Sequence, residues 1–208
     1  MKVELHLHTS RYSGCAVNTP QELMAQLVAC GYEAVFVTEH DSFWPDEQLA
    51  ELRSQFPQLR IFPGVELTIG DLWSMQHLLV LGTTDPEYAA LASGIGRRPD
   101  VAGILQKARD EGHLTVLAHP CRWEDGAAMI DAGLLPDALE HHTCNQGGDQ
   151  AAAALRLAGK VGLPVVNAGD VHSVEMVGRY WIETRAPIDD AGAVRRVVLA
   201  GEYENCLE

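Results

Sequence analysis

The stretch Val3-Glu4-Leu5-His6-Leu7-His8 near the start of the chain alternates apolar and polar residues. A period of two is typical of a β-strand, and it places His6 and His8 on one face, two residues apart. The stretch runs into Thr9-Ser10 and a turn, so both imidazoles lie at the carboxyl end of the predicted strand. Two neutral histidines that converge from a rigid strand form half of a transition-metal site. The other half must come from other strands.

The composition limits the class of protein. The 208 residues are 47% hydrophobic, enough for a sizeable core, and we expect a single domain over residues 1–208. The five cysteines are scattered, with no Cys-x-x-Cys pair, which favours a reducing, cytoplasmic location. We find no secretory signal and no apolar run long enough for a membrane span. The formal net charge of −14 disfavours long nucleic acids as partners.

Strand-like and helix-like segments alternate along the chain. Thr19-Pro20-Gln21-Glu22 is typical of a helix start, with Thr19 as N-cap and Glu22 completing a capping box. We expect strands at 1–8, 34–38, 59–66, 77–82, 114–118, 138–142, 163–168 and 179–183. We expect further helices at 46–55, 100–112, 126–132, 150–159 and 191–200, with an irregular segment at 83–98. This alternation predicts an α/β fold with a parallel sheet.

Potential metal ligands recur where the predicted strands end. Taken singly, each has an ordinary explanation, such as a helix N-cap, but chance does not explain their repetition at one structural position. A β/α barrel places its chemistry at the carboxyl ends of its strands, whereas an open sheet gathers ligands at one switch point. Ligands from six or seven strands therefore favour a ring. The candidates are His6, His8, Glu39, His40, Asp41, Glu66, His77, His119, Glu140, Asp170 and His172.

The mixture of ligands indicates the class of metal. Imidazole nitrogen with carboxylate oxygen, and no thiolate cluster, suits Zn, Mn or Fe. The ligands outnumber what one ion uses, so we expect two or three ions, with Glu66 as a bridge. Closely spaced divalent ions activate water and stabilise both the attacking and the leaving oxygen of a displacement. Such a centre is suited to phosphate ester hydrolysis.

The ordered motifs resemble the PHP family (polymerase and histidinol phosphatase). They are H-x-H, T-E-H-D, G-V-E, H-L-L-V-L-G, A-H-P and G-D-V-H, and they extend from His6 to His172. The resemblance implies a distorted seven-stranded (β/α) barrel with a trinuclear metal centre and phosphatase, phosphoesterase or exonuclease activity. The metal ligands that it implies are His6, His8, His40, Glu66, His77, His119, Asp170 and His172.

Two positions depart from the family pattern. Glu39 stands where the family commonly has Asp, and Cys15 lies near a position where many relatives place an Asp or His ligand. Either the thiolate of Cys15 substitutes or that ligand is absent, which leaves the third ion open. Glu140 matches a strand-end acid of the family that orients a histidine.

The resemblance and the ligand set together predict a metal-dependent phosphoesterase. We expect hydrolysis of a small substrate, a nucleotide or a histidinol-phosphate-like monoester, through a metal-bridging hydroxide. The expected catalytic residues are Glu39, His119, His172 and Arg179. One of the two histidines would protonate the leaving group, and Arg179 would fork a phosphate.

Other residues are weaker candidates for substrate contacts. Three arginines could also bind the phosphate of a substrate: Arg11, Arg97 and Arg98. The aromatic residues Trp44, Trp73 and Trp123 either pack the loops down or stack on a flat substrate group. His113 is interpreted as structural, and at most one of His141 and His142 faces the site.

Two other functions fit the same ligand set. An amidohydrolase-like enzyme would cleave a C–N or lactone bond, but related barrels usually bridge their metals with a Lys-type ligand. This chain has Glu66 at that kind of position, and its three lysines lie elsewhere. The second alternative is a non-catalytic metal-binding PHP module. The sequence leaves the oligomeric state open.

Overall fold

Nine strands form one sheet in the order β7-β6-β5-β4-β3-β2-β1-β8-β9, in a computed structural model that describes residues 1–70, 75–92 and 98–208. The strands are β1 Lys2–Leu7, β2 Ala34–His40, β3 Arg60–Thr68, β4 His77–Leu81, β5 Leu114–Ala118, β6 Ala138–Glu140, β7 Val165–Val166, β8 Tyr180–Thr184 and β9 Tyr203–Leu207. The helices are α1 Pro20–Ala29, α2 Asp46–Gln55, α3 Glu87–Ala92, α4 Val101–Glu111, α5 Ala128–Asp131, α6 Gly148–Val161 and α7 Ala193–Ala200, with a 3₁₀ turn at Val174–Met176.

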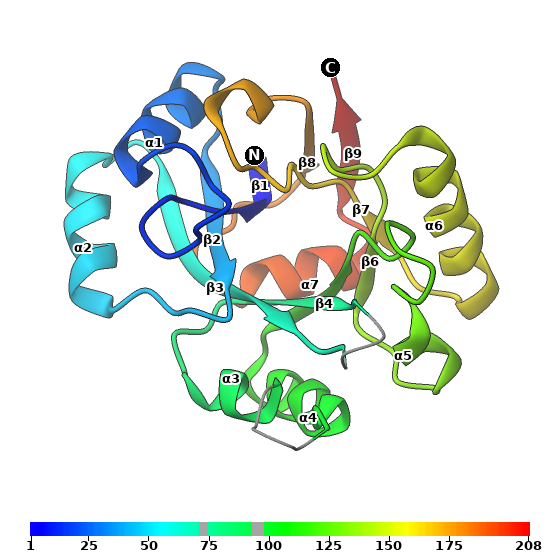
Figure 1. The fold of residues 1–208 in the computed structure, drawn as a ribbon. Coiled ribbons are helices and arrows are strands. Elements are labelled where there is room, and N and C mark those ends of the chain that lie inside the picture. Colours follow the sequence, from blue (N-terminus) through cyan, green and yellow to red (C-terminus); the bar gives the residue numbers. More distant parts are fainter. Residues whose placement is uncertain (71–74, 93–97) are drawn as a thin grey trace.

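The sheet curls until it nearly closes on itself (Figure 1). Leu7 forms an isolated parallel bridge with Val171, which follows β7 in the chain. The His8 amide donates to the Val171 carbonyl at 2.9 Å, and the Val171 amide donates to the His6 carbonyl at 3.0 Å. The first half of β1 instead pairs with β8, at Lys2 and Val3. The free edge of β1 is thus divided between ring closure and the β8–β9 hairpin.

The prediction of a parallel sheet is wrong at β4. This strand runs antiparallel to both β3 and β5, with His77 opposite Thr68 on one side and Ala118 on the other. The reversal brings the first residue of β4 to the rim where its neighbours end. The strand count also differs from the expected seven, because β8 and β9 extend the sheet and β9 was not predicted. The fold is a mixed α/β one with a nearly closed, barrel-like sheet.

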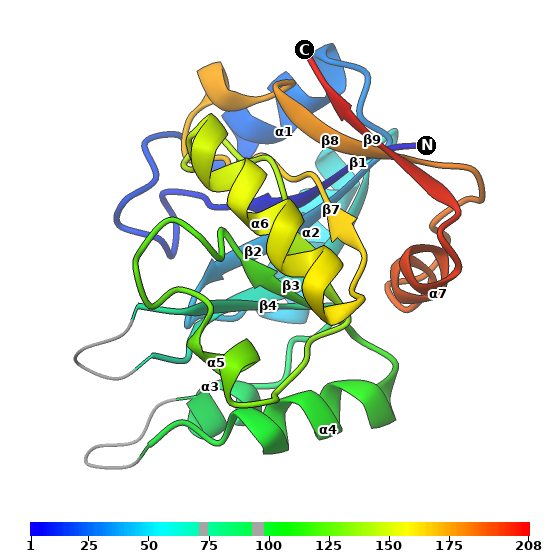
Figure 2. The same cartoon turned by 90° about the vertical axis from the view of Figure 1, so that its right-hand side faces the viewer.

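The helices divide between the outside of the sheet and one end of it. Figure 1 shows α1 to α6 around the outside of the ring and α7 across its centre. In Figure 2, α7 lies at the end near the N-terminus, away from the loops that follow β1, β2 and β5. Val194, Val197 and Val198 of α7 join the buried cluster that contains Phe36 and Leu79. Helix α7 therefore covers the end opposite the expected site. No helix among the described residues is long and apolar enough to span a bilayer.

A β-bulge interrupts the simple alternation predicted for β1. The register against β2 shifts between Glu4 and Leu7. Val3 and Leu5 consequently belong to the cluster under α7, whereas Leu7 packs with Leu23 beneath α1. Bulges re-aim side chains and are frequent beside active sites.

Several boundaries were predicted well because local chemistry determines them. Helix α1 begins with the capping box of Thr19 and Glu22, and α4 has Asp100 as N-cap and Gly112 in the left-handed conformation at its end. The expected irregular segment at 83–98 was wrong in part, because α3 occupies Glu87–Ala92. Tyr88 of α3 is fully buried, so tertiary packing supports a helix with no strong start signal.

The α1 capping box gives a first prediction. The Thr19 hydroxyl accepts from the Glu22 amide at 3.3 Å, while the Glu22 carboxylate accepts from the Thr19 amide at 2.8 Å. We expect Thr19→Ala to lower the free energy of unfolding by about 1 kcal/mol, because one helix amide loses its acceptor. Urea denaturation would measure this change in the free energy of unfolding. Thr19→Ser keeps the hydroxyl and is the control; an equal loss in both variants would contradict the capping explanation.

Candidate metal centre

Histidine and carboxylate side chains from most of the ring strands meet at one rim of the sheet. β4 supplies its first residue because of its reversed direction, and the other strands supply theirs at or just after their carboxyl ends. All of these residues except His40 and His172 are almost completely buried. They are His6, His8, His40, Glu66, His77, His119, Asp170 and His172.

The carboxylate of Glu66 lies at the centre of this cluster. It is fully buried in β3, and both of its oxygens face imidazole nitrogens. Oε1 lies 2.8 Å from His77 Nδ1 and 3.0 Å from His119 Nε2. Oε2 lies 2.9 Å from His40 Nδ1, 3.1 Å from His8 Nε2 and 3.3 Å from His6 Nε2. Glu66 therefore reaches two separate groups of nitrogens, as a bridging ligand must.

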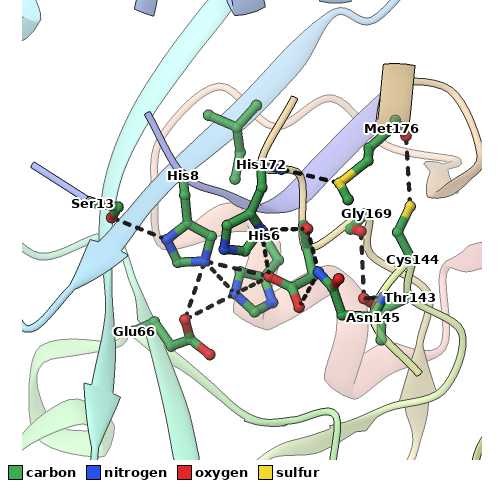
Figure 3. Close-up of polar contacts among 12 residues, drawn as sticks. His6, His8, Ser13, Glu66, Thr143, Cys144, Asn145, Gly169, His172 and Met176 are labelled. Carbon is green, nitrogen blue, oxygen red and sulfur yellow. Dashed lines mark hydrogen bonds and ion pairs between the residues drawn. The ribbon is translucent and has the colours of Figure 1, made fainter. Parts of the chain in front are cut away.

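The spacing of His6, His8 and Asp170 fits one ion. The two Nε2 atoms are 3.0 Å apart, and each lies 3.4 Å from Asp170 Oδ1 (Figure 3). Four ligands about 2.05 Å from a tetrahedral ion would be separated by about 3.3 Å. Glu66 Oε2 is a buried atom without a hydrogen bond, although nitrogens of the cluster surround it. An orphaned oxygen among converging nitrogens is what a cation would satisfy.

Two further sets of ligand atoms have compatible spacing. The donor atoms of His40, Glu66 and His77 lie within 4.8 Å of one another, and so do those of His8, His40 and His172. With the first set, the described residues thus contain three overlapping groups that could hold an ion.

The carboxylates and histidines of the cluster shift each other's pKa values. Burial alone would raise the pKa of Glu66, but the charge of His6 and the contact with His119 hold it well below its ordinary value. The pKa of Asp170 is likewise lowered, because His6 and His8 outweigh burial. Burial would lower the pKa of His6, yet Asp170, Glu66 and Glu140 raise it well above its ordinary value. The carboxylates and the imidazoles of His6 and His8 thus favour each other's charged forms.

Hydrogen bonds to the outer ring nitrogens orient the histidines. His6 Nδ1 lies 2.9 Å from Glu140 Oε1, so Glu140 can accept a hydrogen bond from Nδ1–H, the tautomer in which Nε2 presents its lone pair toward the centre. The other oxygen of Glu140 accepts from the His119 amide at 2.6 Å. His172 Nδ1 lies 2.9 Å from the Asp170 carbonyl, which can only accept, so Nε2 of His172 is also free to bind a metal.

Glu39 lies behind the cluster and orients His8 through Ser13. The Ser13 hydroxyl donates to Glu39 at 2.5 Å, so its oxygen can accept from His8 Nδ1 at 3.3 Å. Glu39 also accepts from the Thr9 amide and hydroxyl and from the Trp44 indole. Both of its oxygens are thereby engaged, and Trp44 is buried rather than open to a substrate.

Glu4 and Gly169 hold the closing segment against β1. The Glu4 carboxylate accepts from the His6 amide at 3.1 Å and from the Gly169 amide at 2.7 Å. Burial raises the pKa of Glu4 to about 7. A Cβ at residue 169 would collide with the Val171 side chain and lie 2.7 Å from Glu4 Oε2. The glycine of the G-D-V-H motif is therefore required by close packing.

The backbone is strained at three residues beside strand ends. Asp41, His119 and Asp170 have φ angles of 47°, 30° and 48°, and they follow β2, β5 and β7. Such conformations are costly for residues with a Cβ and cluster at functional sites. Asp41 itself binds Thr68, with its oxygens 2.8 Å from the Thr68 amide and hydroxyl. It links the ends of β2 and β3.

Several side chains predicted for the site lie at its edge or away from it. The Arg179 side chain is exposed and donates to the Glu175 carbonyl, while Arg11 donates to Gln48 at 2.7 Å. Cys15 is exposed, and burial together with Glu66, Asp170 and Glu39 raises the pKa of its thiol. Arg98 is also exposed. Arg97 and Trp73 lie outside the described residues.

The two adjacent histidines at the end of β6 behave differently from the alternation expected for a strand. The strand ends at Glu140, and the rings of His141 and His142 contact each other with centroids 4.1 Å apart. His142 also stacks on Tyr180 of β8.

Residues that the sequence did not single out contact the candidate ligands. Asn145 donates to both the carbonyl and the carboxylate of Asp170, at 2.9 and 2.8 Å (Figure 3). Ser13 binds His8, and Arg122 reaches within 3.9 Å of Asp170. A polar residue a few positions after each strand-end ligand is the only sequence signal for them, and it is a common one.

Comparison with known proteins places these features in context. A family profile described as PHP-associated matches residues 150–203. The chain is 28% identical over 231 residues to an error-prone DNA polymerase from Nocardia farcinica (strain IFM 10152). That alignment covers 95% of this chain but 20% of the polymerase, so the chain spans about a fifth of that relative's length.

Solved structures share the fold at low sequence identity. A candidate metal-dependent phosphoesterase from Bifidobacterium adolescentis matches with a TM-score of 0.64 and 16% identity, over 94% of both chains. An amidohydrolase from Chromobacterium violaceum, with bound sulfate and no metal, matches with a TM-score of 0.66 and 15% identity, over 98% of both chains. PsfC from Pseudomonas syringae matches with a TM-score of 0.67 and 17% identity, over 100% of this chain and 91% of PsfC. The profile and the polymerase match, together with the ordered motifs, support the resemblance to the PHP family.

Proposed function

We propose that this PHP domain, as one unit over residues 1–208, is a metal-dependent phosphoesterase that hydrolyses a small phosphate monoester. The observation that carries the proposal is the position of Glu66, whose two oxygens each face imidazoles of different strands. A carboxylate shared in this way is suited to holding two divalent ions close together. When bound, such ions activate water and neutralise the oxygens of a phosphoryl group.

The proposed ligand sets follow from the spacing of the donor atoms. His6, His8 and Asp170 would hold one ion, with Glu66 shared. His77 and His119, which face the other oxygen of Glu66, would hold the second. His40 and His172 remain for a third ion; Cys15, which the sequence suggested as a further ligand, is exposed and belongs to none of the candidate groups found among the described residues. We propose two or three ions of Zn, Mn or Fe, since the donors are nitrogen and oxygen.

The protein side chains would fix the geometry of this centre. Glu140 sets the tautomer of His6, and Ser13 with Glu39 sets that of His8. The His172 ring, whose Nδ1 binds the Asp170 carbonyl, is placed better as a ligand than as a proton donor. His119 is the remaining histidine from the expected catalytic set, and its Nε2 faces Glu66. Each imidazole therefore has a role in holding ions or in holding a neighbour.

An amidohydrolase-like reaction on a C–N or lactone bond is the second candidate. It is favoured by the fold shared with the Chromobacterium violaceum amidohydrolase. The bridging carboxylate of Glu66 favours phosphate chemistry instead, and the sulfate bound by that relative has the tetrahedral shape of phosphate. The relation to a DNA polymerase does not transfer its activity, because the chain spans a fifth of it and carries a net charge of −14.

The proposed function predicts metal-dependent phosphate release. Protein loaded with Mn²⁺ or Zn²⁺ should hydrolyse a small monoester from a panel of nucleotides and sugar phosphates, with inorganic phosphate as a competitive inhibitor. His8→Ala and Asp170→Ala should lower kcat/KM by at least about 1,000-fold, because each removes a ligand of the proposed first ion. Phosphate release under steady-state conditions measures this.

The control for that experiment is His113→Ala, which removes a histidine near Tyr88 and Glu111, outside the cluster. It should keep its activity within about twofold. Fully metal-loaded wild-type protein that is inert to the whole panel would overturn the phosphoesterase proposal. Release of ammonia or a carboxylate from amide or lactone substrates, without inhibition by phosphate, would establish the second candidate instead.

Glu140 provides a test that does not depend on turnover. In Glu140→Gln the side chain keeps its shape, but one of its ends becomes a donor and faces either His6 Nδ1 or the His119 amide. We expect metal affinity to fall about 10- to 100-fold, because the tautomer and orientation of His6 are no longer fixed. Competition with a chromophoric chelator would measure the dissociation constant.

Glu204→Gln is the matched control, since Glu204 lies in the exposed strand β9 and pairs with Arg185. It should bind metal as the wild type does. Equal affinity of Glu140→Gln and wild type would show that His6 does not need Glu140 to bind an ion.

A further inference from the structure

Arg122 lies in a hydrogen-bonded turn beside the candidate metal centre. The turn follows β5 and the strained residue His119. The Arg122 amide donates to the His119 carbonyl at 2.9 Å, and the Arg122 carbonyl accepts from the Gln150 side chain of α6 at 3.1 Å. Hydrogen bonds therefore fix both the backbone amide and the backbone carbonyl of Arg122 relative to His119, a proposed ligand.

The guanidinium of Arg122 extends toward the carboxylate of Asp170. Nη1 lies 3.9 Å from Asp170 Oδ2, and the side chain keeps 36% of its accessible surface. It also lies over the Trp123 ring, 4.7 Å from the centroid. Trp123 in turn contacts the rings of His77 and His119 edge-on, with centroids 5.3 and 5.1 Å away. The guanidinium is thus held by stacking directly beside the ligand histidines.

The guanidinium donors of Arg122 make no hydrogen bond with the part of the chain that the structure describes. A separation of 3.9 Å is too long for a hydrogen bond. Asp170 Oδ2 already accepts from Asn145 at 2.8 Å. No hydrogen bond joins the Arg122 side chain to another residue of the described ranges 1–70, 75–92 and 98–208. A half-buried guanidinium with open donors and a fixed stem is suited to receive an anion from solvent.

We propose that Arg122 binds the non-bridging oxygens of the substrate phosphate and thereby selects substrates with a terminal phosphate monoester. The inference rests on the proposed function and names a contact that the sequence did not suggest. A planar guanidinium can donate two parallel hydrogen bonds to one phosphate, which a doubly charged terminal phosphate accepts better than a singly charged diester. In a chain with a net charge of −14, an anionic substrate needs such a local cation.

The alternative arginines are less well placed. Arg179 and Arg11 already donate to Glu175 and Gln48. Among the lysines and arginines of the described residues, Arg122 alone has its charged group within 4.0 Å of a carboxylate of the metal cluster. Arg122 follows His119 by three residues, and its side chain is partly exposed at the rim of the site.

The experiment compares Arg122→Gln and Arg122→Lys with the wild type, using 4-nitrophenyl phosphate as substrate and inorganic phosphate as inhibitor. Arg109→Gln, an exposed arginine in the last turn of α4, removes the same charge elsewhere and is the control. We expect Arg122→Gln to raise both KM and the inhibition constant of phosphate about 10- to 100-fold, with a smaller change in kcat. Arg122→Lys should recover part of the loss, and metal content by elemental analysis should stay unchanged.

Three outcomes in the variants would overturn the inference and leave the proposed function standing. An unchanged KM and phosphate inhibition constant in Arg122→Gln would show that Arg122 does not contact the phosphate. A fall in metal content that accounts for the lost activity would show that Arg122 acts only by holding Asp170. An equal effect in Arg109→Gln would indicate a general effect of charge. Absence of phosphate release by the wild type would overturn the proposed function itself, and the inference with it, so the wild-type assay separates the two.

Discussion

The buried carboxylate of Glu66 is the constraint on which the rest of the site depends. An ionised carboxylate without a partner in the protein interior costs several kcal/mol. Here five imidazoles from β1, β2, β4 and β5 or the residues beside them surround its two oxygens at 2.8 to 3.3 Å. No single helix or loop could present so many nitrogens to one group. A sheet that curls until its strand ends face one another can present them, even though the side chains come from segments far apart in the sequence.

Two departures from a regular parallel barrel complete this arrangement. The first is the reversal of β4, without which His77 would lie at the end covered by α7. The second is the closure through Leu7 and Val171 rather than through a full strand pair. Because β7 has two residues, the chain leaves regular pairing early, and Asp170 takes a φ of 48° at the point of closure. The strained φ of Asp170 and the short strand pairing of β7 fit a segment whose conformation serves to position Asp170 rather than to stabilise the sheet.

The sequence predicted which side chains converge better than it predicted the sheet that presents them. Residue types recurring at strand ends give a strong signal, whereas hydrophobic alternation carries no information about strand direction. The reversal of β4 did have a signal, since only eight residues separate Thr68 from His77, and a parallel crossover needs about a dozen or more. The register shift in β1 had no signal, and the roles of Ser13 and Asn145 had only a common one, because they depend on contacts with other segments, such as Ser13 with Glu39 and Asn145 with Asp170. Glu39 was found as a strand-end acid, but its four donors become apparent only in three dimensions.

The distribution of charge connects the cluster with its surroundings. Inside, the carboxylates of Glu66 and Asp170 are balanced by imidazoles, and metal ions bound there would add positive charge at a point shielded from water. Outside, a net charge of −14 repels anions at long range, an effect that salt screens over roughly 8–10 Å. Under the proposed function, an anionic substrate would then be attracted only once it reaches the rim, where Arg122 is half-exposed. Short-range attraction within a repulsive surface favours small phosphate esters, which bring few charges past that surface, over long polymers that would lay many phosphates along it.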